Sequence, residues 1–552
     1  MSRLGRIAGA LALVLVLGSQ TVHTQRGAQV PPEVAARLSV LRGEYGPHRA
    51  NNDLLTYDLR VRVDPERRHL QGRNIIRFRM LNNDTRIQID LYSTLAADRI
   101  LFKGKPLEFD RELNSVFIDF PETLRKGQTH EIEFHYSGVP QEQGRFGGIA
   151  FRKDPQGRHW INTACEGEGS SIWWPSKDQW RDEPESMKLG VEIPDGLTDV
   201  SNGRFTGKTS LGDGYTRWDW QINYPINSYN VSLNIGTYEH FAEKHGDLTL
   251  DYWVLPENLD KAKAQFTQVK PMIEAFEHYF GEYPFPKDGF KLIEVPYTGM
   301  EHQSAVTYGN GYRNGYGGRD WTGVGVSPKF DFIIIHESAH EWFGNAVSAA
   351  DVSDMWIQEG WTTYLECLYV ERVFGYDDAL KYTNGYRTKI ANKQPVITER
   401  GRHRTPSQDM YFKGALFLHT LRSVFNDDAK WWKTIRGYYE SARYRNVMTE
   451  EMVTFFNKAS GMDLTPVFNQ YLRRAPLPVL ELQRDATAGV VRYRWVADEP
   501  GFAMPIKAGR RGAWEVLKPT SDWQTFKWAG AMDTFEVATE LYYVIVREVP
   551  TT

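Results

Sequence analysis

The chain has 552 residues, of which 41% are hydrophobic, 25% charged and 13% aromatic, a composition typical of a folded protein and not of a disordered or fibrous one. This length exceeds what one hydrophobic core usually supports, so two to four domains are expected. The formal net charge of −4 and the lack of a long Lys or Arg run argue against nucleic acid as a partner.

The first 25 residues have the pattern of a secretory signal peptide. Arg3 and Arg6 precede an apolar run from Ile7 to Leu17, which is too short to span a bilayer comfortably. No A-x-A cleavage site follows this run, so an uncleaved membrane anchor stays open as the alternative. We therefore predict a secreted or periplasmic protein that has no stable membrane insertion after cleavage.

The next part of the chain is predicted to be a lead-in segment followed by an all-β domain. Residues 26–52 contain two adjacent prolines and show no strand alternation. Between residues 53 and 245, short alternating runs are separated by turns, as expected for strands. In the first run, Tyr57, Leu59, Val61 and Val63 alternate with polar residues. A turn at Asp64-Pro65 then predicts a β-hairpin with one solvent-exposed face.

The hydrophobic period changes to that of helices after about residue 246. Apolar residues follow helical spacing at Ala262, Phe266, Val269, Ile273, Phe276 and Phe280. We predict a mainly helical domain over residues 246–474 and, where alternation returns, a small β domain over 475–552. The expected fold class is multidomain α+β. Cys165 and Cys367 fall in different predicted domains, so two buried thiols are expected rather than a disulfide.

A metal-binding motif lies in the helical part, in the segment His336-Glu337-Ser338-Ala339-His340. Residues i and i+4 share one face of a helix, so both imidazoles can reach one Zn²⁺ ion with Glu337 beside them. A catalytic zinc site has three protein ligands, and Glu359, separated from His340 by eighteen intervening residues, is the candidate for the third. A water molecule at the fourth position would then give up a proton to Glu337, which acts as the general base.

These residues resemble the aminopeptidase N family of zinc metallopeptidases, which also includes the leukotriene hydrolases. The resemblance covers about Asp53 to Arg474, and its zinc motif is matched by His336, His340, Glu359, Gly360, Tyr364 and Glu366. It implies an N-terminal β domain over the active site, a thermolysin-like α/β catalytic domain and a short C-terminal β-sandwich domain. For Glu366 two interpretations stay open: a hydrogen bond that holds a zinc-ligand histidine, or a pair with a nearby cation.

A second match distinguishes an aminopeptidase from an endopeptidase. The family carries Gly-x-Met-Glu-Asn on a strand beside the zinc, and here the matching run is Thr298-Gly299-Met300-Glu301, with His302 in place of Asn. The resemblance assigns Glu301 to the substrate's free α-amino group, and Gly299 and Met300 to the substrate backbone. A carboxylate fixed one residue away from the zinc favours an ammonium group and disfavours a continuing chain.

Two further matches complete the predicted site. In the run Thr163-Ala164-Cys165-Glu166, Glu166 falls on a residue that also contacts the α-amino group, although Ala164 replaces the family's Gln. Tyr411, followed by Lys413 and Gly414, falls on the tyrosine that stabilises the oxyanion of the tetrahedral intermediate.

The sequence therefore predicts a zinc aminopeptidase that acts on peptides with a free N-terminus. The alternatives are a thermolysin-type endopeptidase, an epoxide hydrolase of the leukotriene type, and a non-catalytic peptide-binding protein on the same scaffold. The family's large helical C-terminal domain is not found in this sequence, so a more open site that accepts longer peptides is expected. The sequence indicates neither the preferred N-terminal residue nor the oligomeric state.

Overall fold

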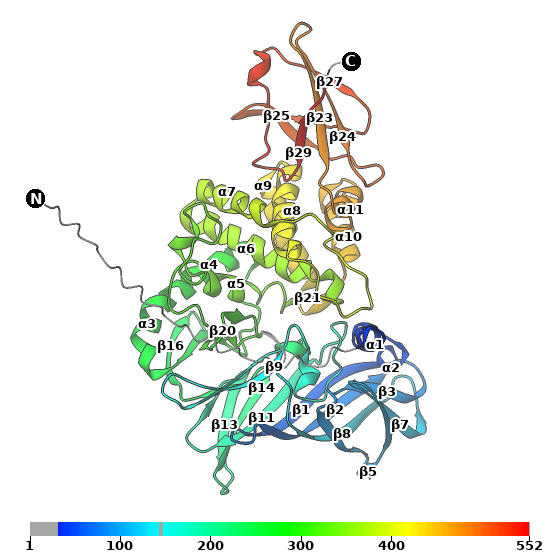
Figure 1. Ribbon diagram of the computed structural model, residues 1–552, viewed down its shortest axis with the longest axis vertical. Coiled ribbons are helices and arrows are strands. Elements are labelled where there is room, and N and C mark those ends of the chain that lie inside the picture. The colour runs from blue at the N-terminus through cyan, green and yellow to red at the C-terminus, as the bar shows by residue number, and fades with distance from the viewer. Residues whose placement is uncertain (1–30, 143–146, 551–552) are drawn as a thin grey trace, which may run out of the picture.

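The computed structural model describes residues 31–142 and 147–550 of the chain. They form three tiers along the long axis of the molecule: a large group of strands, a helical middle, and a small group of strands at the other end (Figure 1). This is the predicted multidomain α+β architecture with an N-terminal β-sheet domain. The predicted signal peptide, residues 1–25, lies outside the described residues.

The N-terminal tier is built on an eight-stranded sheet with the order β13-β14-β11-β1-β2-β8-β4-β5. Its strands are β1 (Asn52–Asp64), β2 (His69–Met80), β4 (Leu95–Phe102), β5 (Lys105–Pro106), β8 (Thr129–Gly138), β11 (Ser186–Pro194), β13 (Arg204–Ser210) and β14 (Tyr215–Ile222). The predicted hairpin is the antiparallel pair β1 and β2. Its alternation is confirmed, since the four predicted inward residues of β1 are all buried.

Two smaller sheets complete this tier. One has the order β3-β7-β6, with β3 (Asp84–Asp90), β6 (Glu108–Glu112) and β7 (Ser115–Leu124). The other has the order β12-β15-β10-β9, with β9 (Gly148–Lys153), β10 (His159–Ala164), β12 (Thr198–Asp199) and β15 (Asn234–Gly236). Because β10 ends at Ala164, the second sheet determines where the turn with Glu166 begins.

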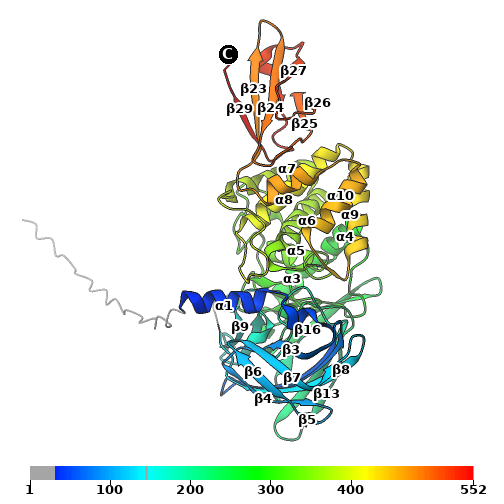
Figure 2. The ribbon, with the colours of Figure 1, turned by 90° about the vertical axis from the view of Figure 1, so that its right-hand side faces the viewer.

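The predicted lead-in segment contains two helices, α1 (Pro32–Gly43) and α2 (Pro47–Ala50). Each begins with a proline, whose fixed φ suits the first turn of a helix. Figure 2 shows α1 at the junction of the N-terminal and helical tiers. Beyond α1, the fully buried Arg49 donates a hydrogen bond to Asp90 Oδ2 at 2.5 Å, which ties the segment to β3.

The middle tier packs helices against a five-stranded sheet with the order β16-β17-β18-β20-β19. Its strands are β16 (Glu239–His245), β17 (Leu248–Val254), β18 (Phe290–Glu294), β19 (Gly299–Met300) and β20 (Val306–Tyr308), and β21 (Val347–Ala349) pairs with β22 (Arg445–Val447). Its helices are α3 (Leu259–Gln265), α4 (Val269–Phe280), α5 (Phe332–Ala339), α6 (Trp356–Phe374), α7 (Tyr376–Gly385), α8 (Asp409–Phe425), α9 (Asp428–Ala442), α10 (Thr449–Ser460) and α11 (Thr465–Leu472).

The predicted boundary between residues 245 and 246 divides a hairpin. β16 pairs antiparallel with β17 over its whole length, and β17 continues the sheet through β18. The hydrophobic pattern of the sequence changes to a helical period only where the first helix of this tier begins. Two strands of the tier's sheet, β16 and β17, come before that helix. We therefore place the boundary before β16.

The C-terminal tier consists of two small sheets. One has the order β27-β24-β23-β29 and the other β26-β25-β28. Their strands are β23 (Val479–Asp485), β24 (Val490–Val496), β25 (Ile506–Arg510), β26 (Ala513–Leu517), β27 (Gln524–Lys527), β28 (Glu536–Val537) and β29 (Ile545–Glu548). The alternation predicted for this part of the chain thus corresponds to paired strands.

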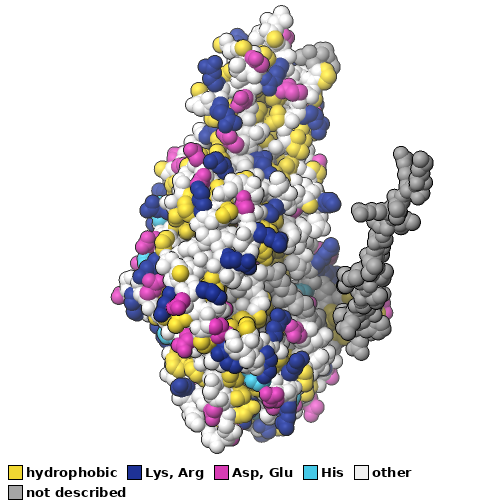
Figure 3. All heavy atoms as spheres, turned by 60° about the vertical axis from the view of Figure 1, so that its left-hand side comes forward, with side chains coloured by type: hydrophobic (Ala, Val, Ile, Leu, Met, Phe, Trp, Pro, Cys, Tyr) yellow, Lys and Arg dark blue, Asp and Glu magenta, His cyan; other side chains and the backbone are white. Residues whose placement is uncertain are grey.

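The surface carries charges of both signs. In Figure 3, Lys and Arg are interspersed with Asp and Glu over the face that is drawn, in keeping with the small net charge of −4. Over the ranges that the structure describes, no helix combines the length and apolarity needed to cross a membrane. Cys165 and Cys367 are both buried and unpaired, as predicted.

Candidate active site

The two histidines of the metal-binding motif lie at the C-terminal end of α5. The helix begins after Asp331, whose Oδ1 accepts hydrogen bonds from the backbone N–H groups of Ile333 and Ile334. This N-cap fixes the start of the helix. Since His336 and His340 lie about one turn apart, their side chains project from the same face.

Both imidazole rings are oriented by hydrogen bonds from Nδ1. His336 Nδ1 donates to Glu366 Oε1 at 2.6 Å, and His340 Nδ1 donates to the carbonyl of Phe343 at 3.0 Å. With Nδ1 protonated, each neutral ring presents the lone pair of Nε2 to the site. Glu366 therefore has the first of its two predicted interactions, the hydrogen bond that holds a histidine.

The two Nε2 atoms face one carboxylate oxygen of Glu359, in the first turn of α6. Glu359 Oε2 lies 3.3 Å from His340 Nε2 and 3.7 Å from His336 Nε2. This oxygen has no hydrogen-bond partner in the described part of the chain, although it is buried. Two ligand atoms of a tetrahedral zinc ion are separated by roughly 3.3 Å. The three atoms therefore fit Zn²⁺ both in spacing and in ligand type.

Glu337 projects from α5 toward β19. A Cβ atom added to Gly299 would lie 2.9 Å from Glu337 Oε1 and 2.7 Å from Ile333 Cγ2, so the strand passes this carboxylate closely and requires glycine there. Burial raises the pKa of Glu337 to about 7. A carboxylate with a pKa in that range can both take and return a proton near neutral pH.

Tyr411 reaches the metal-binding residues from the first turn of α8. Its ring centroid lies 6.1 Å from that of His336. Burial, reinforced by the carboxylates of Glu359 and Glu166, raises the pKa of Tyr411 well above the ordinary value. The phenol therefore keeps its proton and can donate a hydrogen bond to developing negative charge.

Two glycines allow α8 to approach α6. A Cβ atom added to Gly414 would lie 2.8 Å from the Cα atom of Gly360, so the two helices cross almost backbone to backbone. This contact brings Tyr411, at the start of α8, beside Glu359, at the start of α6. The neighbouring Lys413 points away from the site and donates to two backbone carbonyls at residues 474 and 475.

Glu301 follows β19 and is held at both its side chain and its backbone. Tyr229 Oη donates to Glu301 Oε1 at 2.8 Å, and Gln358 Nε2 donates to the same hydroxyl at 2.9 Å. Asn345 Nδ2 donates to the backbone carbonyl of Glu301 at 2.8 Å. These contacts leave the second carboxylate oxygen of Glu301 available to a substrate.

Glu166 lies on the turn after β10 and faces the same space. Carboxylate oxygens of Glu166, Glu301 and Glu359 all lie within 4.8 Å of one another. Burial, followed by repulsion from Glu301 and Glu359, raises the pKa of Glu166 well above its usual range. Such a cluster is stabilised by added positive charge, so the site is suited to a metal cation and an ammonium group side by side.

His302 occupies the position at which the resembled family has Asn. The side chain is fully buried, and neither ring nitrogen has a hydrogen-bond partner among the residues described. Burial lowers the pKa of His302 to about 3, so the ring is neutral at physiological pH. The substitution therefore adds no charge next to Glu301.

A hollow of about 200 Å³ opens on the Glu337 side of the metal-binding residues. Its walls are largely aromatic, and they include Tyr316, Trp321, Phe332, Tyr411 and Phe412. Neither Glu301 nor Glu166 lines it. The hollow thus borders Glu337 and His336 without including the carboxylates of Glu301 and Glu166.

Sequence reasoning missed several residues that hold the predicted ones in place. Asn345 lies five residues after His340 and Gln358 directly before Glu359, so their nearness in sequence was a usable signal. Tyr229 gave no such signal, since 72 residues separate it from Glu301. On the metal side, Glu366 Oε2 also accepts from the hydroxyls of Tyr382 and Tyr386, which come from the next helix and the turn after it.

Comparisons with known proteins agree with this architecture. Residues 54–230 match the model of the Peptidase M1 N-terminal domain, and residues 264–471 match the Peptidase family M1 domain. The chain is similar to a probable aminopeptidase 2 of Sulfurisphaera tokodaii, with 24% identity over 397 residues, which cover 68% of this chain and 48% of that protein.

Aminopeptidase N of Mus musculus is 28% identical over 292 residues, which cover 49% of this chain and 28% of the mouse protein. The chain thus aligns with less than half the length of these two relatives. A crystal structure of an M1 zinc metallopeptidase from Deinococcus radiodurans superposes with a TM-score of 0.64 at 21% identity, covering 77% of this chain and 94% of that one. At that identity, the likeness establishes the fold.

Proposed function

Because the chain belongs to peptidase family M1, the aminopeptidase N family of zinc metallopeptidases, we propose that it is a zinc aminopeptidase that removes residues from the free N-termini of peptides. One observation carries the proposal. The carboxylates of Glu301 and Glu166 stand within 4.8 Å of Glu359, which is itself 3.3 Å from His340. A cation-binding pair of carboxylates therefore adjoins a metal-binding triad.

His336, His340 and Glu359 would hold one zinc ion. When bound, the ion supplies a Lewis acid and makes a nearby water molecule more acidic. The hydrogen bonds from His336 to Glu366 and from His340 to the Phe343 carbonyl keep both Nε2 lone pairs directed at the ion.

Glu337 and Tyr411 would carry out the proton transfer and the charge stabilisation. Glu337 takes a proton from the attacking water and returns it to the leaving amine, a task that suits its raised pKa of about 7. Tyr411 donates a hydrogen bond from its O–H to the negative charge that develops on the carbonyl oxygen. Gly299 and Met300, on β19, would align the backbone of the substrate beside Glu337.

Glu301 and Glu166 would bind the substrate's α-ammonium group. Charge-assisted hydrogen bonds are about twice as strong as neutral ones, and Glu301 is buried whereas Glu166 is partly buried. A peptide that continued past this point would place a neutral amide against two carboxylates. The arrangement therefore selects the end of a chain.

The aromatic hollow would take the side chain that follows the scissile bond. It adjoins Glu337, which would protonate the leaving amine, and neither Glu301 nor Glu166 lines it. Trp321 Nε1 and Thr363 Oγ1 line it and have no hydrogen-bond partner within the described ranges. Aromatic walls with unpaired polar groups suit a peptide whose second residue has a large side chain that ends in a polar group.

We further propose that the protein is exported. The basic residues Arg3 and Arg6 before a short apolar run support a signal peptide. Fractionation of cells, with N-terminal sequencing of the mature protein, would test this. We also propose that the two C-terminal sheets pack as a β-sandwich.

A single experiment separates the proposed activity from its alternatives. A hexapeptide and its N-acetylated twin are incubated with the enzyme, with and without a chelator, and the products are identified by mass spectrometry. Stepwise, chelator-sensitive removal of residues from the free peptide alone supports an aminopeptidase. Internal cleavage of both peptides would show a thermolysin-type endopeptidase, and the absence of products across several sequences would favour a peptide-binding protein.

A further inference from the structure

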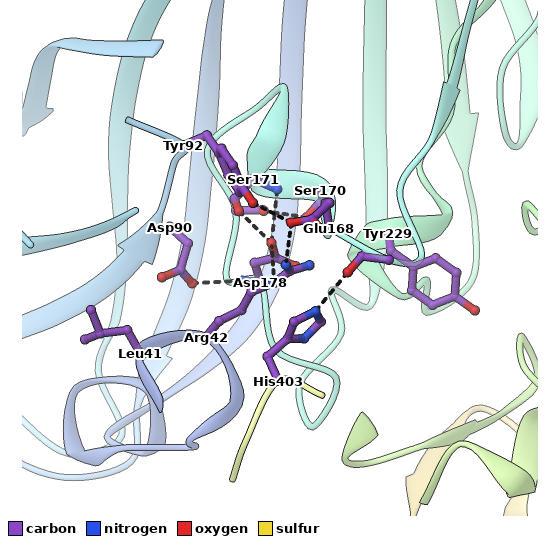
Figure 4. A network of polar contacts seen from close by, with 12 residues as sticks. Leu41, Arg42, Asp90, Tyr92, Glu168, Ser170, Ser171, Asp178, Tyr229 and His403 are labelled. Carbon is purple, nitrogen blue, oxygen red and sulfur yellow. Dashed lines mark hydrogen bonds and ion pairs between the residues drawn. The ribbon is translucent and has the colours of Figure 1, made fainter. Parts of the chain in front are cut away.

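The turn formed by residues 165–169 carries Glu166, whose carboxylate lies near Glu301 and Glu359. Arg42, Tyr92 and His403 contact the turn from three other segments, and we call the side that they contact its outer side (Figure 4). The turn closes on itself through a hydrogen bond from the N–H of Gly169 to the carbonyl of Cys165, at 2.6 Å. On its outer side, His403 Nε2 donates to the carbonyl of Gly167 at 2.9 Å. The backbone next to Glu166 is therefore fixed by a side chain from the catalytic part of the chain.

Glu168, the other carboxylate of the turn, points outward. Its Oε2 accepts a hydrogen bond from Tyr92 Oη at 2.6 Å and from Arg42 Nη1 at 3.5 Å. Arg42 lies on α1, and its Nε is also 3.8 Å from Asp178 Oδ2. Glu168 is thus linked to α1 and to the end of β3.

The packing around the end of the turn leaves no room for a side chain. Gly169 has φ +78°, and a Cβ atom there would lie 2.2 Å from Asp178 Oδ2 and 2.4 Å from Arg42 Nη2. Asp178 Oδ2 in turn accepts hydrogen bonds from the N–H and the hydroxyl of Ser171. Arg42 and Asp178 therefore define the position of the turn's last residue.

Helix α1 is joined to the catalytic part through the same histidine. The N–H of His403 donates to the carbonyl of Ser39 at 2.9 Å, and Ser39 Oγ donates to the carbonyl of His403 at 3.2 Å. α1, residue 403 and the turn thus form a closed ring of contacts across two tiers. α1 precedes residue 54, where the match to the family's N-terminal domain begins, so this support is additional to the matched domains.

Close packing fixes Gly169, whereas polar contacts hold the part of the turn that borders a cavity. The cavity has a volume of about 430 Å³ and is lined by Leu38 and Leu41 of α1 and by Tyr92, Glu168 and His403 among others. Among the described residues, no hydrogen bond holds Glu166 Oε1. This contrasts with Glu301, whose side chain is fixed by Tyr229. The direction of the Glu166 side chain therefore depends on the backbone of the turn.

We propose that His403 and Arg42 are positioning residues for recognition of the substrate's α-amino group, and that they act by holding the turn that carries Glu166. The proposal rests on the aminopeptidase function proposed above. Neither residue would touch the substrate. Their loss would leave the metal site intact and would weaken only the binding that depends on Glu166.

The test measures the Kd of a peptide with a free N-terminus and of its acetylated twin. Calorimetry is performed on the zinc-loaded enzyme carrying Glu337→Gln, so that no substrate is consumed. In that background, His403→Ala and Arg42→Ala should each weaken binding of the free peptide by about 5- to 20-fold, the range expected for one or two lost hydrogen bonds. Binding of the acetylated peptide should change by less than about twofold.

Arg37→Ala is the matched control. Arg37 lies on the same helix and is bonded to Glu112, through contacts of 2.6 and 2.8 Å at the exposed face. Its loss should leave both Kd values unchanged. Tyr92→Phe, which removes only the hydroxyl that bonds Glu168, is the mild second variant if His403→Ala does not fold.

A double variant shows whether the effect passes through Glu166. If it does, adding His403→Ala to Glu166→Gln should produce no further loss, because interacting residues are not additive. A full additional loss, an equal loss for the acetylated peptide, or the same loss in Arg37→Ala would overturn the proposal. So would unchanged binding in the His403, Arg42 and Tyr92 variants. The aminopeptidase function is tested separately by Glu301→Gln and can stand in either case.

Discussion

The metal-binding half of the site and the amino-binding half are built in different ways. The three proposed zinc ligands and Glu337 lie within residues 336–359, on two successive helices, and each histidine is oriented by a residue of α6 or of the loop before it. The amino-binding half brings together Glu166 and Glu301, with support from Tyr229 and His403. The chemistry is encoded locally, whereas selection of a chain end depends on tertiary structure.

This difference predicts a hierarchy of effects. Substitutions in the metal-binding half should abolish turnover of every substrate, because all cleavage needs the metal and the base. Substitutions in the amino-binding half should leave the metal in place and change which peptides are cut. The following predictions test this separation.

The largest effect is expected for His340→Ala. Loss of one of three ligands should reduce bound zinc well below one ion per chain and lower kcat/KM by at least about 10⁴-fold. Metal analysis and kinetics on the same sample measure both quantities. A variant that kept its zinc and its activity would show that the triad is not the metal site.

Glu337→Gln should leave zinc bound and reduce kcat by about 10²- to 10⁴-fold, the usual contribution of a general base. KM should change little, since Glu337 acts on the water and the leaving amine. Steady-state kinetics together with zinc content check this. Unchanged kcat would place the base elsewhere.

Tyr411→Phe should lower kcat by about 10²- to 10³-fold, the range for the loss of one donor to developing charge. Phenylalanine preserves the ring packing against His336, so fold and metal content should be retained. If only KM rose, Tyr411 would have to be a substrate-binding residue, and the division between the two halves would need revision.

The smallest effect concerns stability in the amino-binding half. Burial lowers the pKa of His302 to about 3, whereas a histidine in an unfolded chain titrates near 6.5. Between these values the unfolded chain binds a proton that the folded chain does not, so stability falls as the pH decreases from about 6.5 toward 3. His302→Asn removes this loss, which amounts to about 2 kcal/mol at pH 5.

Thermal unfolding at pH 7 and pH 5 measures the effect of His302. The midpoint should fall more for the wild type than for His302→Asn. Other groups near the zinc titrate in both proteins and cancel in the comparison. Equal decreases would mean that the buried ring accepts a proton in the folded state.

Much of the fold could be predicted from the sequence because local periodicity follows burial. The alternation at Tyr57, Leu59 and Val61 matches the buried face of β1, and the helical spacing after residue 260 matches α3 and α4. Helix α1 was missed because it lacks a continuous apolar stripe: only Leu41 and Gly43 of its residues are buried. It is held by polar contacts to distant segments, which leave no periodic signal.

The residues of the candidate site also differ in how well they could be predicted from local sequence. His336, His340 and Glu359 could be placed together because a helical turn and the next helix bring them together. Glu166 and Glu301 could be linked only through resemblance to a family, since 135 residues separate them (301 − 166). Nothing in the local sequence indicates that Tyr229 bonds Glu301 or that His403 bonds the turn next to Glu166.

The most direct test of the aminopeptidase function compares kcat/KM for a peptide and its N-acetylated twin, in the wild type and in Glu301→Gln. The wild type should strongly prefer the free amine, and Glu301→Gln should reduce that preference by about 10- to 100-fold, the value of a charge-assisted hydrogen bond. Zinc content and the slow cleavage of the acetylated peptide should not change. An unchanged preference in Glu301→Gln would contradict the assignment of this carboxylate to the α-amino group, and with it the proposed reason why the enzyme acts at chain ends.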